Sequence, residues 1–227
     1  MSSGEAPTAS AIVDAATPAP VVPSAPSGIT LRSPSKYLDA SSRSSSSSAA
    51  DTPPGDWLAR SWSVTHSTLS MWRSAQNVRI SYGVLPDDDK GRARNEDHVE
   101  YESNKKEAEG TKKKVKSVQG TNTASAPGVG FDWRGKGWLF FVTSHWEILG
   151  WGERPLADGQ VERWAVTWFA PTLFTKEGLD YYSDRREGLS SETTAALKAA
   201  ADAAWPAPLL ELAKDLEPID IKLPWSE

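Results

Sequence analysis

From Gly55 onward, short runs of aromatic and β-branched residues alternate with polar ones and are separated by turn residues. In the stretch NVRISY, Val78, Ile80 and Tyr82 alternate with polar side chains, which is the two-residue period of a strand with one buried face. Pro-Asp, Glu-Gly, Pro-Gly and Asp-Gly pairs lie between the runs and indicate turns. The pattern predicts strands over residues 57–66, 77–85, 97–103, 113–121, 131–143, 145–151, 161–170 and 178–183.

The period changes after the last of these strands. Residues 190–205 are rich in Ala, with Ser190 placed to cap a helix and Glu192 placed in its first turn. A shorter apolar stretch, 209–216, follows two prolines and predicts a second helix. About eight sequential strands and then a helix, without strand–helix alternation, predict an all-β fold: an up-and-down antiparallel β-barrel with a C-terminal α-helix. Eight strands is also the number at which a closed sheet can hold one small ligand.

The N-terminal part of the chain has a different composition. Runs such as TPAPVVPSAPSG and SSRSSSSSAAD contain few large apolar side chains, so they cannot offset the entropy lost on ordering. Ten of the eleven Trp residues lie between Trp57 and Trp205, which places the packing there. We therefore predict a disordered Ser/Pro/Ala-rich tail over 1–52 and one barrel domain over 53–227.

Charge and cysteine content exclude several classes of function. The net charge is −5, and residues 87–116 carry nine acids and nine bases, a balance typical of a solvated loop and a lysine-protected strand edge. Nucleic acid is therefore not the expected partner. The chain has no Cys, which excludes disulfides, thiolate metal ligands and cysteine nucleophiles. No apolar run approaches a membrane span and no secretory signal is visible, so we expect a cytosolic or nucleocytoplasmic protein.

Several motifs resemble the lipocalins, within the wider calycin group of barrels. Gly55-Asp56-Trp57 stands at the start of the first predicted strand, where the family has a Gly-x-Trp signature. Near the other end, LDYYSDRREGLSSETTAALKAA gives a strand, a Ser near an Arg and then a capped helix, as lipocalins do. The resemblance covers residues 55–216 and implies a closed barrel that binds a small apolar molecule.

The resemblance also implies which residues close the barrel. By position, Gly55 and Trp57 correspond to the signature, and Trp57 would plug the closed end. Arg185, or alternatively Arg186, would pack its guanidinium across the indole, a cation–π contact worth about 0.5–2 kcal/mol. The open end would then admit the ligand. Trp72, Tyr82, Tyr101, Trp146 and Trp168 are the candidate ligand-binding residues, because inward-facing side chains of a small barrel must line or fill its lumen.

Three residues are candidates for acid–base chemistry. His145 and Glu147 are two apart on a predicted strand and so share a face. If that face is the lumen, the pair could transfer protons in a dry pocket. If it faces solvent, they form an exposed polar pair while Trp146 and Ile148 point inward. His66, which ends the first predicted strand, is the third candidate.

Metal and phosphate sites are not expected. The three histidines, at 66, 98 and 145, are scattered, and a structural zinc site needs about four ligands. The calcium-like start at Asp87 fails because Arg92 stands where the loop needs Gly. The nucleophile elbow and the glycine-rich nucleotide loops are missing, and residues 133–137 are better interpreted as a turn with basic side chains. We predict no metal and no cofactor.

Three functional hypotheses remain at this stage. The first is a carrier that binds a small hydrophobic molecule in the lumen without turnover. The second is a lipocalin-fold isomerase or cyclase that acts on a small apolar metabolite through His145, Glu147 or His66. The third is a barrel that serves mainly as a scaffold, with a lumen filled by its own tryptophans, while the Ser/Pro-rich tail carries interactions and phosphorylation. Lumen polarity separates the first two and lumen volume tests the third.

Overall fold

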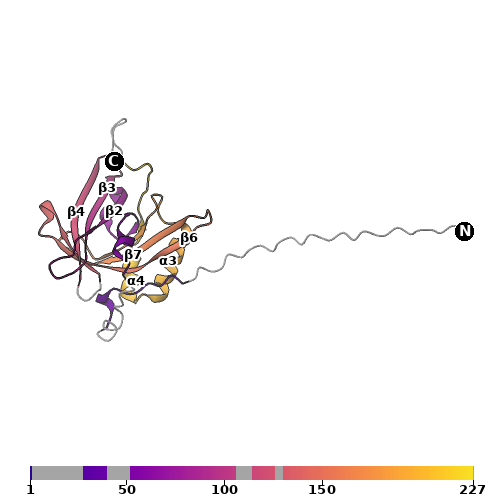
Figure 1. Ribbon diagram of the computed structural model, residues 1–227, viewed down its shortest axis with the longest axis horizontal. Coiled ribbons are helices and arrows are strands. Elements are labelled where there is room, and N and C mark those ends of the chain that lie inside the picture. The colour runs from indigo at the N-terminus through magenta and orange to yellow at the C-terminus, as the bar shows by residue number, and fades with distance from the viewer. Residues whose placement is uncertain (2–27, 40–51, 106–113, 126–129, 227) are drawn as a thin grey trace.

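The computed structural model describes residues 1, 28–39, 52–105, 114–125 and 130–226, and Figure 1 shows their arrangement. Nine strands pair in the order β2-β3-β4-β5-β6-β7-β8-β1-β9, and a further β2–β1 pairing closes the first eight into a ring. Neighbouring strands pair in antiparallel fashion throughout. The predicted eight-strand up-and-down barrel is confirmed, and its architecture is that of the lipocalin fold.

The strands lie close to their predicted positions. They are β1 (Ser61–Ser67), β2 (Ala75–Leu85), β3 (Arg94–Ser103), β4 (Val115–Ala124), β5 (Phe131–Gly135), β6 (Thr143–Pro155), β7 (Val161–Phe169), β8 (Gly178–Ser183) and the two-residue β9 (Glu217–Pro218). Two predicted strands are wrong in part. The strand predicted over 57–66 begins only at Ser61, because residues 55–58 form the short helix α2 (Gly55–Leu58). The strand predicted over 131–143 ends at residue 135. A turn of 3₁₀-helix, η4 (Gly137–Leu139), replaces its second half. Gly137 at its start adopts φ 61°, a conformation that breaks a strand.

The two longest helices follow the barrel strands, and shorter helical turns lie before and between the strands. They are η1 (Ser35–Tyr37), α2 (Gly55–Leu58), η3 (Ser70–Ser74), α3 (Ser191–Ala204) and α4 (Ala207–Ala213). The predicted cap of α3 is confirmed, because the Ser190 hydroxyl accepts a hydrogen bond from the Thr193 amide at 3.2 Å and Glu192 lies in the first turn. None of the helices in the described part of the chain is long and apolar enough to cross a bilayer.

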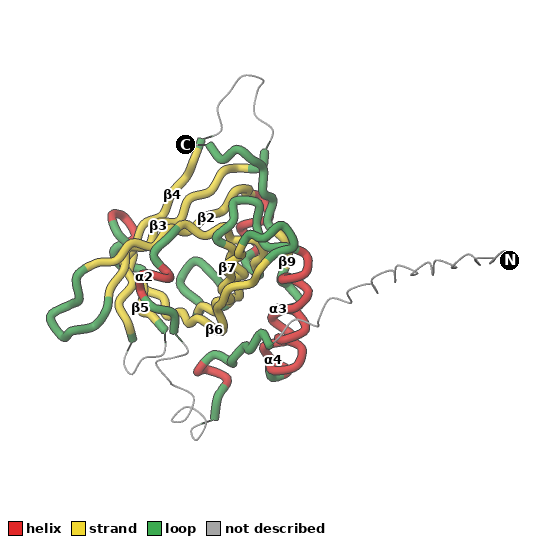
Figure 2. The backbone as a smooth tube through the Cα atoms, turned by 45° about the vertical axis from the view of Figure 1, so that its right-hand side comes forward, coloured by secondary structure: helices red, strands yellow, loops and turns green. Residues whose placement is uncertain are grey.

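Two hydrophobic clusters divide the molecule into an inside and an outside. The first fills part of the barrel and includes Trp62, Val64 and Trp146. The second lies between the outer face of β6–β8 and helices α3 and α4, and it includes Leu179 and Leu197. Figure 2 shows both helices on one outer side of the barrel. The helices therefore cover the wall and leave the lumen to the first cluster.

Residues 28–39 depart from the predicted disordered tail. Leu31 is buried in the outer cluster, and the Arg32 amide donates a hydrogen bond to the Leu149 carbonyl at 2.8 Å. The Trp205 indole in turn donates to the Arg32 carbonyl at 3.2 Å. This segment therefore packs along β6 and against the end of α3. The rest of the predicted tail, 2–27 and 40–51, lies outside the described residues.

Gly120 on β4 lets an indole lie directly against the sheet. A Cβ at this position would lie 2.0 Å from Trp133 Nε1. We therefore expect Gly120→Ala to lower the free energy of unfolding by about 1–3 kcal/mol, since it forces Trp133 out of place. Gly55→Ala is the control, because a Cβ there meets nothing within 4 Å. Chemical denaturation of both variants tests this, and equal stabilities would contradict it.

Candidate functional site

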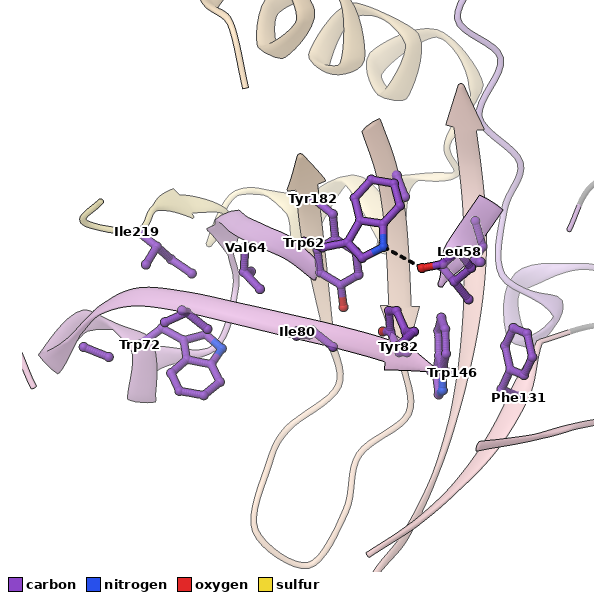
Figure 3. Packing of buried hydrophobic residues seen from close by; sticks show 14 residues of the cluster. Leu58, Trp62, Val64, Trp72, Ile80, Tyr82, Phe131, Trp146, Tyr182 and Ile219 are labelled. Atoms are coloured by element: carbon purple, nitrogen blue, oxygen red, sulfur yellow. Dashed lines mark hydrogen bonds between the residues drawn. The ribbon is translucent and has the colours of Figure 1, made fainter. Parts of the chain in front are cut away.

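The barrel encloses an open cavity of about 550 Å³. It is walled by side chains from the inner face of the barrel, and Figure 3 shows several of them, among them Ile80, Tyr82 and Trp146. These residues alternate along each strand with residues of the outer face, as the two-residue strand period requires. The lumen is therefore not filled by its own tryptophans, and the scaffold hypothesis based on a filled barrel is not supported.

Aromatic rings form much of the cavity wall. Trp72 and Tyr101 meet edge to face with centroids 5.1 Å apart. Tyr82 and Trp146 are stacked at 5.7 Å, and Phe131 stacks on the other side of Trp146 at 4.8 Å. Such paired rings hold one another in fixed positions. Four of the five predicted ligand-binding residues thus line the cavity: Trp72, Tyr82, Tyr101 and Trp146.

Trp168 is the exception among the predicted ligand-binding residues. It belongs to the outer cluster, and its indole donates a hydrogen bond to Glu177 Oε1 at 2.7 Å. Its neighbours on β7, Thr167 and Phe169, line the cavity instead. The Trp168 side chain therefore points out of the barrel, and its position does not support the prediction that it contacts a ligand in the lumen.

One end of the cavity is open and carries exposed apolar side chains. Met71, Trp138 and Phe174 line the cavity and are nevertheless exposed to solvent. They come from the β1–β2, β5–β6 and β7–β8 connections, which an up-and-down barrel places at the same end. Apolar rims of this kind mark an opening through which an apolar molecule can pass.

The other end is closed by a tryptophan cluster. Trp62 is fully buried and donates its indole N–H to the Leu58 carbonyl at 2.9 Å, drawn as a dashed line in Figure 3. Trp57 is only half-buried and packs on Trp62 and Trp151 with centroids 5.1 and 4.8 Å apart. Trp57 therefore belongs to the closure, as predicted, but Trp62 occupies the deeper position.

The cation over these rings is Arg60, not the predicted Arg185. The Arg60 guanidinium lies 5.5 Å from the Trp57 ring and 5.7 Å from the Trp62 ring. Arg185 instead approaches buried Glu162 at 3.7 Å. The alternative, Arg186, lies over Trp225 at 5.0 Å. The Gly-x-Trp motif at Gly55 therefore predicted the closed end of the barrel correctly. The arginine that packs on the tryptophans, however, is close to them in sequence and does not come from the segment after the last barrel strand.

His145 and Glu147 lie on the outer face of β6, while Trp146 and Ile148 point inward. Neither of the two alternatives holds for Glu147, which lies outside the lumen and is nevertheless 0% exposed. Residues 28–39 cover it: Arg32 Nη1 lies 2.6 Å from Glu147 Oε2, and the Ser35 amide and hydroxyl both donate to the carboxylate. Burial alone would raise the pKa of Glu147, but hydrogen bonds from His145, Ser35 and Arg32 outweigh it and hold the pKa at about 2.

His145 completes this outer network. Its Nε2 lies 3.5 Å from Glu147 Oε1 and its Nδ1 lies 2.9 Å from Asp132 Oδ1. The hydrogen bond to Glu147, helped by Asp132, raises the pKa of His145 against the effect of burial. The pair is therefore a structural ion pair that fastens the N-terminal segment to the barrel, separated by the wall from the lumen.

His66 also lies outside the lumen. It lines a second hollow of about 620 Å³ between the barrel wall and helices α3 and α4, together with Lys198 and Asp202. Burial lowers the pKa of His66. All three acid–base candidates of the isomerase or cyclase hypothesis are therefore absent from the cavity, and that hypothesis loses the groups on which it depended.

Two buried carboxyl groups that sequence reasoning missed do face the cavity. Asp97 on β3 is 8% exposed and Asp180 on β8 is 5% exposed, and both line the lumen. Burial raises the pKa of Asp97 to about 6, against an opposing hydrogen bond from Asn122. Burial likewise raises the pKa of Asp180 to about 7, with Ser67 opposing it. The alternation of inward and outward residues along a strand is the sequence signal for them. Asp97 is two residues from Val99 and Asp180 is two residues from Tyr182, so each aspartate lies on the same face as a cavity residue.

No group of His, Asp or Glu side chains suited to a metal ion occurs among the described residues. The polar groups of the cavity are few and lie in an otherwise apolar wall. Such a cavity can enclose an apolar molecule and hydrogen-bond to one polar group on it.

Comparisons with known proteins give distant structural likenesses. No protein-family model and no curated protein sequence matches the chain. Among solved structures, lobster apocrustacyanin A1 is 11% identical, with 87% of this chain and 93% of that one covered and a TM-score of 0.48. Apocrustacyanin C1 is 12% identical, with 78% and 84% covered and a TM-score of 0.48. The siderocalin Ex-FABP, which functions through dual ligand specificities, is 14% identical, with 64% and 85% covered and a TM-score of 0.39. At this distance they add nothing to the fold, which rests on the strand pairing.

Proposed function

We propose that the barrel binds a small, largely apolar molecule in its lumen and carries or sequesters it without chemical conversion. The single observation that supports this proposal is the open cavity of about 550 Å³ inside the barrel. Pockets for small molecules span about 300–1,000 Å³ and are lined mainly by apolar and aromatic side chains. Desolvation of an apolar ligand against these rings supplies the driving force.

The position of the rings favours a carrier over a surface-binding protein. The aromatic walls at Trp72, Tyr101 and Trp146 lie inside the barrel, where a ligand loses most of its contact with water. The exposed apolar rim at Trp138 and Phe174 gives the ligand a route from the surface.

A cytosolic or nucleocytoplasmic location of the protein is also part of the proposal.

The first test is whether the chain retains or takes up an apolar molecule. Native mass spectrometry of the full chain, purified gently from its own cells and then denatured, identifies any retained compound. Titration with a neutral naphthylamine fluorophore, which brightens in apolar surroundings, measures binding by the purified protein. We expect saturable binding of one molecule per chain. A chain that retains nothing and does not bind the fluorophore would refute the proposal.

A pair of matched variants locates the binding in the lumen. Val99 lines the cavity, whereas Val84 is exposed at the end of β2. Val99→Trp places an indole in the cavity and is expected to weaken fluorophore binding about tenfold or more, which corresponds to about 1.4 kcal/mol. Val84→Trp adds the same group outside and should leave binding unchanged. If both variants bind like the native chain, the fluorophore site lies elsewhere.

A further inference from the structure

Three polar side chains in the lumen have buried atoms without a partner. They are Asp97, Thr167 and Asp180, which are 8%, 2% and 5% exposed. Asp97 Oδ1, Thr167 Oγ1 and Asp180 Oδ1 have no partner with hydrogen-bond geometry among the described residues. The nearby hydroxyls of Tyr182 and Ser67 interact only weakly with Thr167 and Asp180. Buried polar groups in native proteins are nearly always hydrogen-bonded, and an unpaired one costs about 1–3 kcal/mol. Three of them on the wall of one cavity therefore indicate a missing partner inside that cavity.

Strand register brings these groups toward the same part of the lumen. Thr167 and Asp180 are direct partners across β7 and β8. Asp97 projects from β3, which is separated from β8 by only β2 and β1. Tyr82 is the direct partner of Asp97 across β2 and β3, and the hydroxyl ends of Tyr82 and Tyr182 lie close to each other in Figure 3. Both carboxyl groups interact electrostatically with both tyrosines, so the five side chains form one polar zone in a wall that is mainly apolar.

The charge of this zone is uncompensated. None of the described residues that line the cavity is Lys, Arg or His. The hydrogen bond from Asn122 reaches only Asp97 Oδ2, at 3.2 Å. An unpaired buried carboxylate is costly, and a cation in the cavity removes that cost. A metal ion does not fit, because no suitable ligand cluster exists among the described residues.

We propose that the lumen binds an apolar molecule that carries a protonated amine, and that Asp97, Thr167 and Asp180 hold this amine. The inference rests on the proposed function and specifies its ligand class. An ammonium group offers three donors and a positive charge, which matches three unpartnered acceptors of which two are carboxyl oxygens. The apolar body of the molecule would pack against Trp72, Tyr101 and Trp146. A fatty-acid carboxylate, by contrast, would meet two groups of like charge.

The experiment compares three ligands that differ only in their polar end. Dodecylamine, dodecanol and dodecanoate are titrated against the full chain, below their aggregation limits, by displacement of the neutral naphthylamine fluorophore. We expect the amine to bind about tenfold or more tightly than the alcohol, the usual size of a charged hydrogen-bond effect. The carboxylate should bind most weakly.

Isosteric variants assign the preference to the two carboxyl groups. Asp97→Asn and Asp180→Asn keep the side-chain shape and remove the charge, so each should weaken amine binding about tenfold and leave alcohol binding nearly unchanged. Asp87→Asn removes a charge from an exposed position and controls for attraction of the amine to the acidic surface. Circular dichroism verifies that each variant is folded.

The pH dependence supplies a second readout. Asp97 and Asp180 are the carboxyl groups that face this zone, and Tyr82 and Tyr182 stay protonated because burial raises the pKa of each well above its ordinary value. Amine affinity should therefore rise between pH 5 and pH 8, in the range where pKa values of about 6 and about 7 place the ionisation of the two aspartates. Alcohol affinity should stay flat.

The outcomes separate this inference from the proposed function. If amine and alcohol bind equally and the Asn variants change neither, or if dodecanoate binds best, the amine site is refuted while the carrier proposal stands. If none of the three ligands displaces the fluorophore and the fluorophore itself does not bind, the proposed function fails.

Discussion

Replacing Glu147 with alanine is expected to lower the free energy of unfolding by about 3–5 kcal/mol, the usual cost of breaking a buried ion pair from one side. The carboxylate is 0% exposed and accepts hydrogen bonds from both Arg32 and Ser35. Its removal leaves the Arg32 guanidinium and the Ser35 amide without their acceptor. We also expect residues 28–39 to loosen from β6, because this network joins the two segments across more than a hundred residues of sequence.

Two measurements test this expectation. Chemical denaturation gives the change in unfolding free energy, and hydrogen exchange at the Ser35 amide reports on the segment itself. Asp132→Ala is the matched control, because it removes the other carboxylate beside His145. The Asp132 side chain is 57% exposed, so its removal should lower the free energy of unfolding by less than about 1 kcal/mol. Equal effects of the two variants would contradict the structural role assigned to Glu147.

The pH dependence of the Glu147→Ala deficit has a defined sign. The pKa of Glu147 is held at about 2, below its ordinary value near 4.3, so its stabilising contribution is complete above that ordinary value. The contribution is lost as pH falls toward about 2. The deficit of Glu147→Ala should therefore shrink below pH 4. It should also shrink as pH rises through the raised pKa of His145, because Glu147 stabilises the charged imidazole, so the deficit is largest between about pH 5 and pH 6.

The barrel strands could be predicted because local alternation reports directly on a half-buried strand. The strand 178–183 coincides with β8, and the inward set Val78, Ile80 and Tyr82 on β2 was assigned correctly. The ordered part of the N-terminal segment could not be predicted in this way. Its Ser/Pro-rich composition resembles a disordered chain, and the partners that hold Arg32 and Ser35 lie 112–115 residues away in the sequence.

The candidate site was predictable only in part. Aromatic residues in a small barrel must point inward or outward, but sequence alone does not give the direction when both faces are apolar. Trp168 illustrates this, because α3 and α4 make the outer face of β7 as buried as the inner one. Asp97 and Asp180 were missed because an aspartate on a strand is usually solvated, although each shares its parity with lumen residues.

Replacing Asp180 with asparagine is expected to stabilise the protein at pH 8 and to have little effect at pH 4. Burial raises the pKa of Asp180 from an ordinary value near 3.9 to about 7, so the folded state binds this proton more tightly than the unfolded state. For a raised carboxyl pKa, stability falls as pH rises from about 4 through about 7 and stays low above that. One pKa unit corresponds to about 1.4 kcal/mol, so the ionisation of Asp180 costs the folded protein on the order of 2–4 kcal/mol at pH 8. The Asn side chain carries no charge and escapes this cost.

Thermal and chemical denaturation at pH 4 and pH 8 measure the effect, with exposed Asp87→Asn as the control that removes the same charge at the surface. Asp97→Asn should act in the same direction and less strongly, because the pKa of Asp97 is raised only to about 6. A carboxyl group whose removal stabilises the folded protein is not there to stabilise it.

If dodecylamine raises the stability of the native chain at pH 8 but not that of Asp180→Asn, the same carboxylate accounts for both the loss of stability on ionisation and the binding of the amine. If Asp180→Asn is less stable than the native chain at pH 8, the carboxylate has a partner in the folded protein, and the lumen site loses its physical basis.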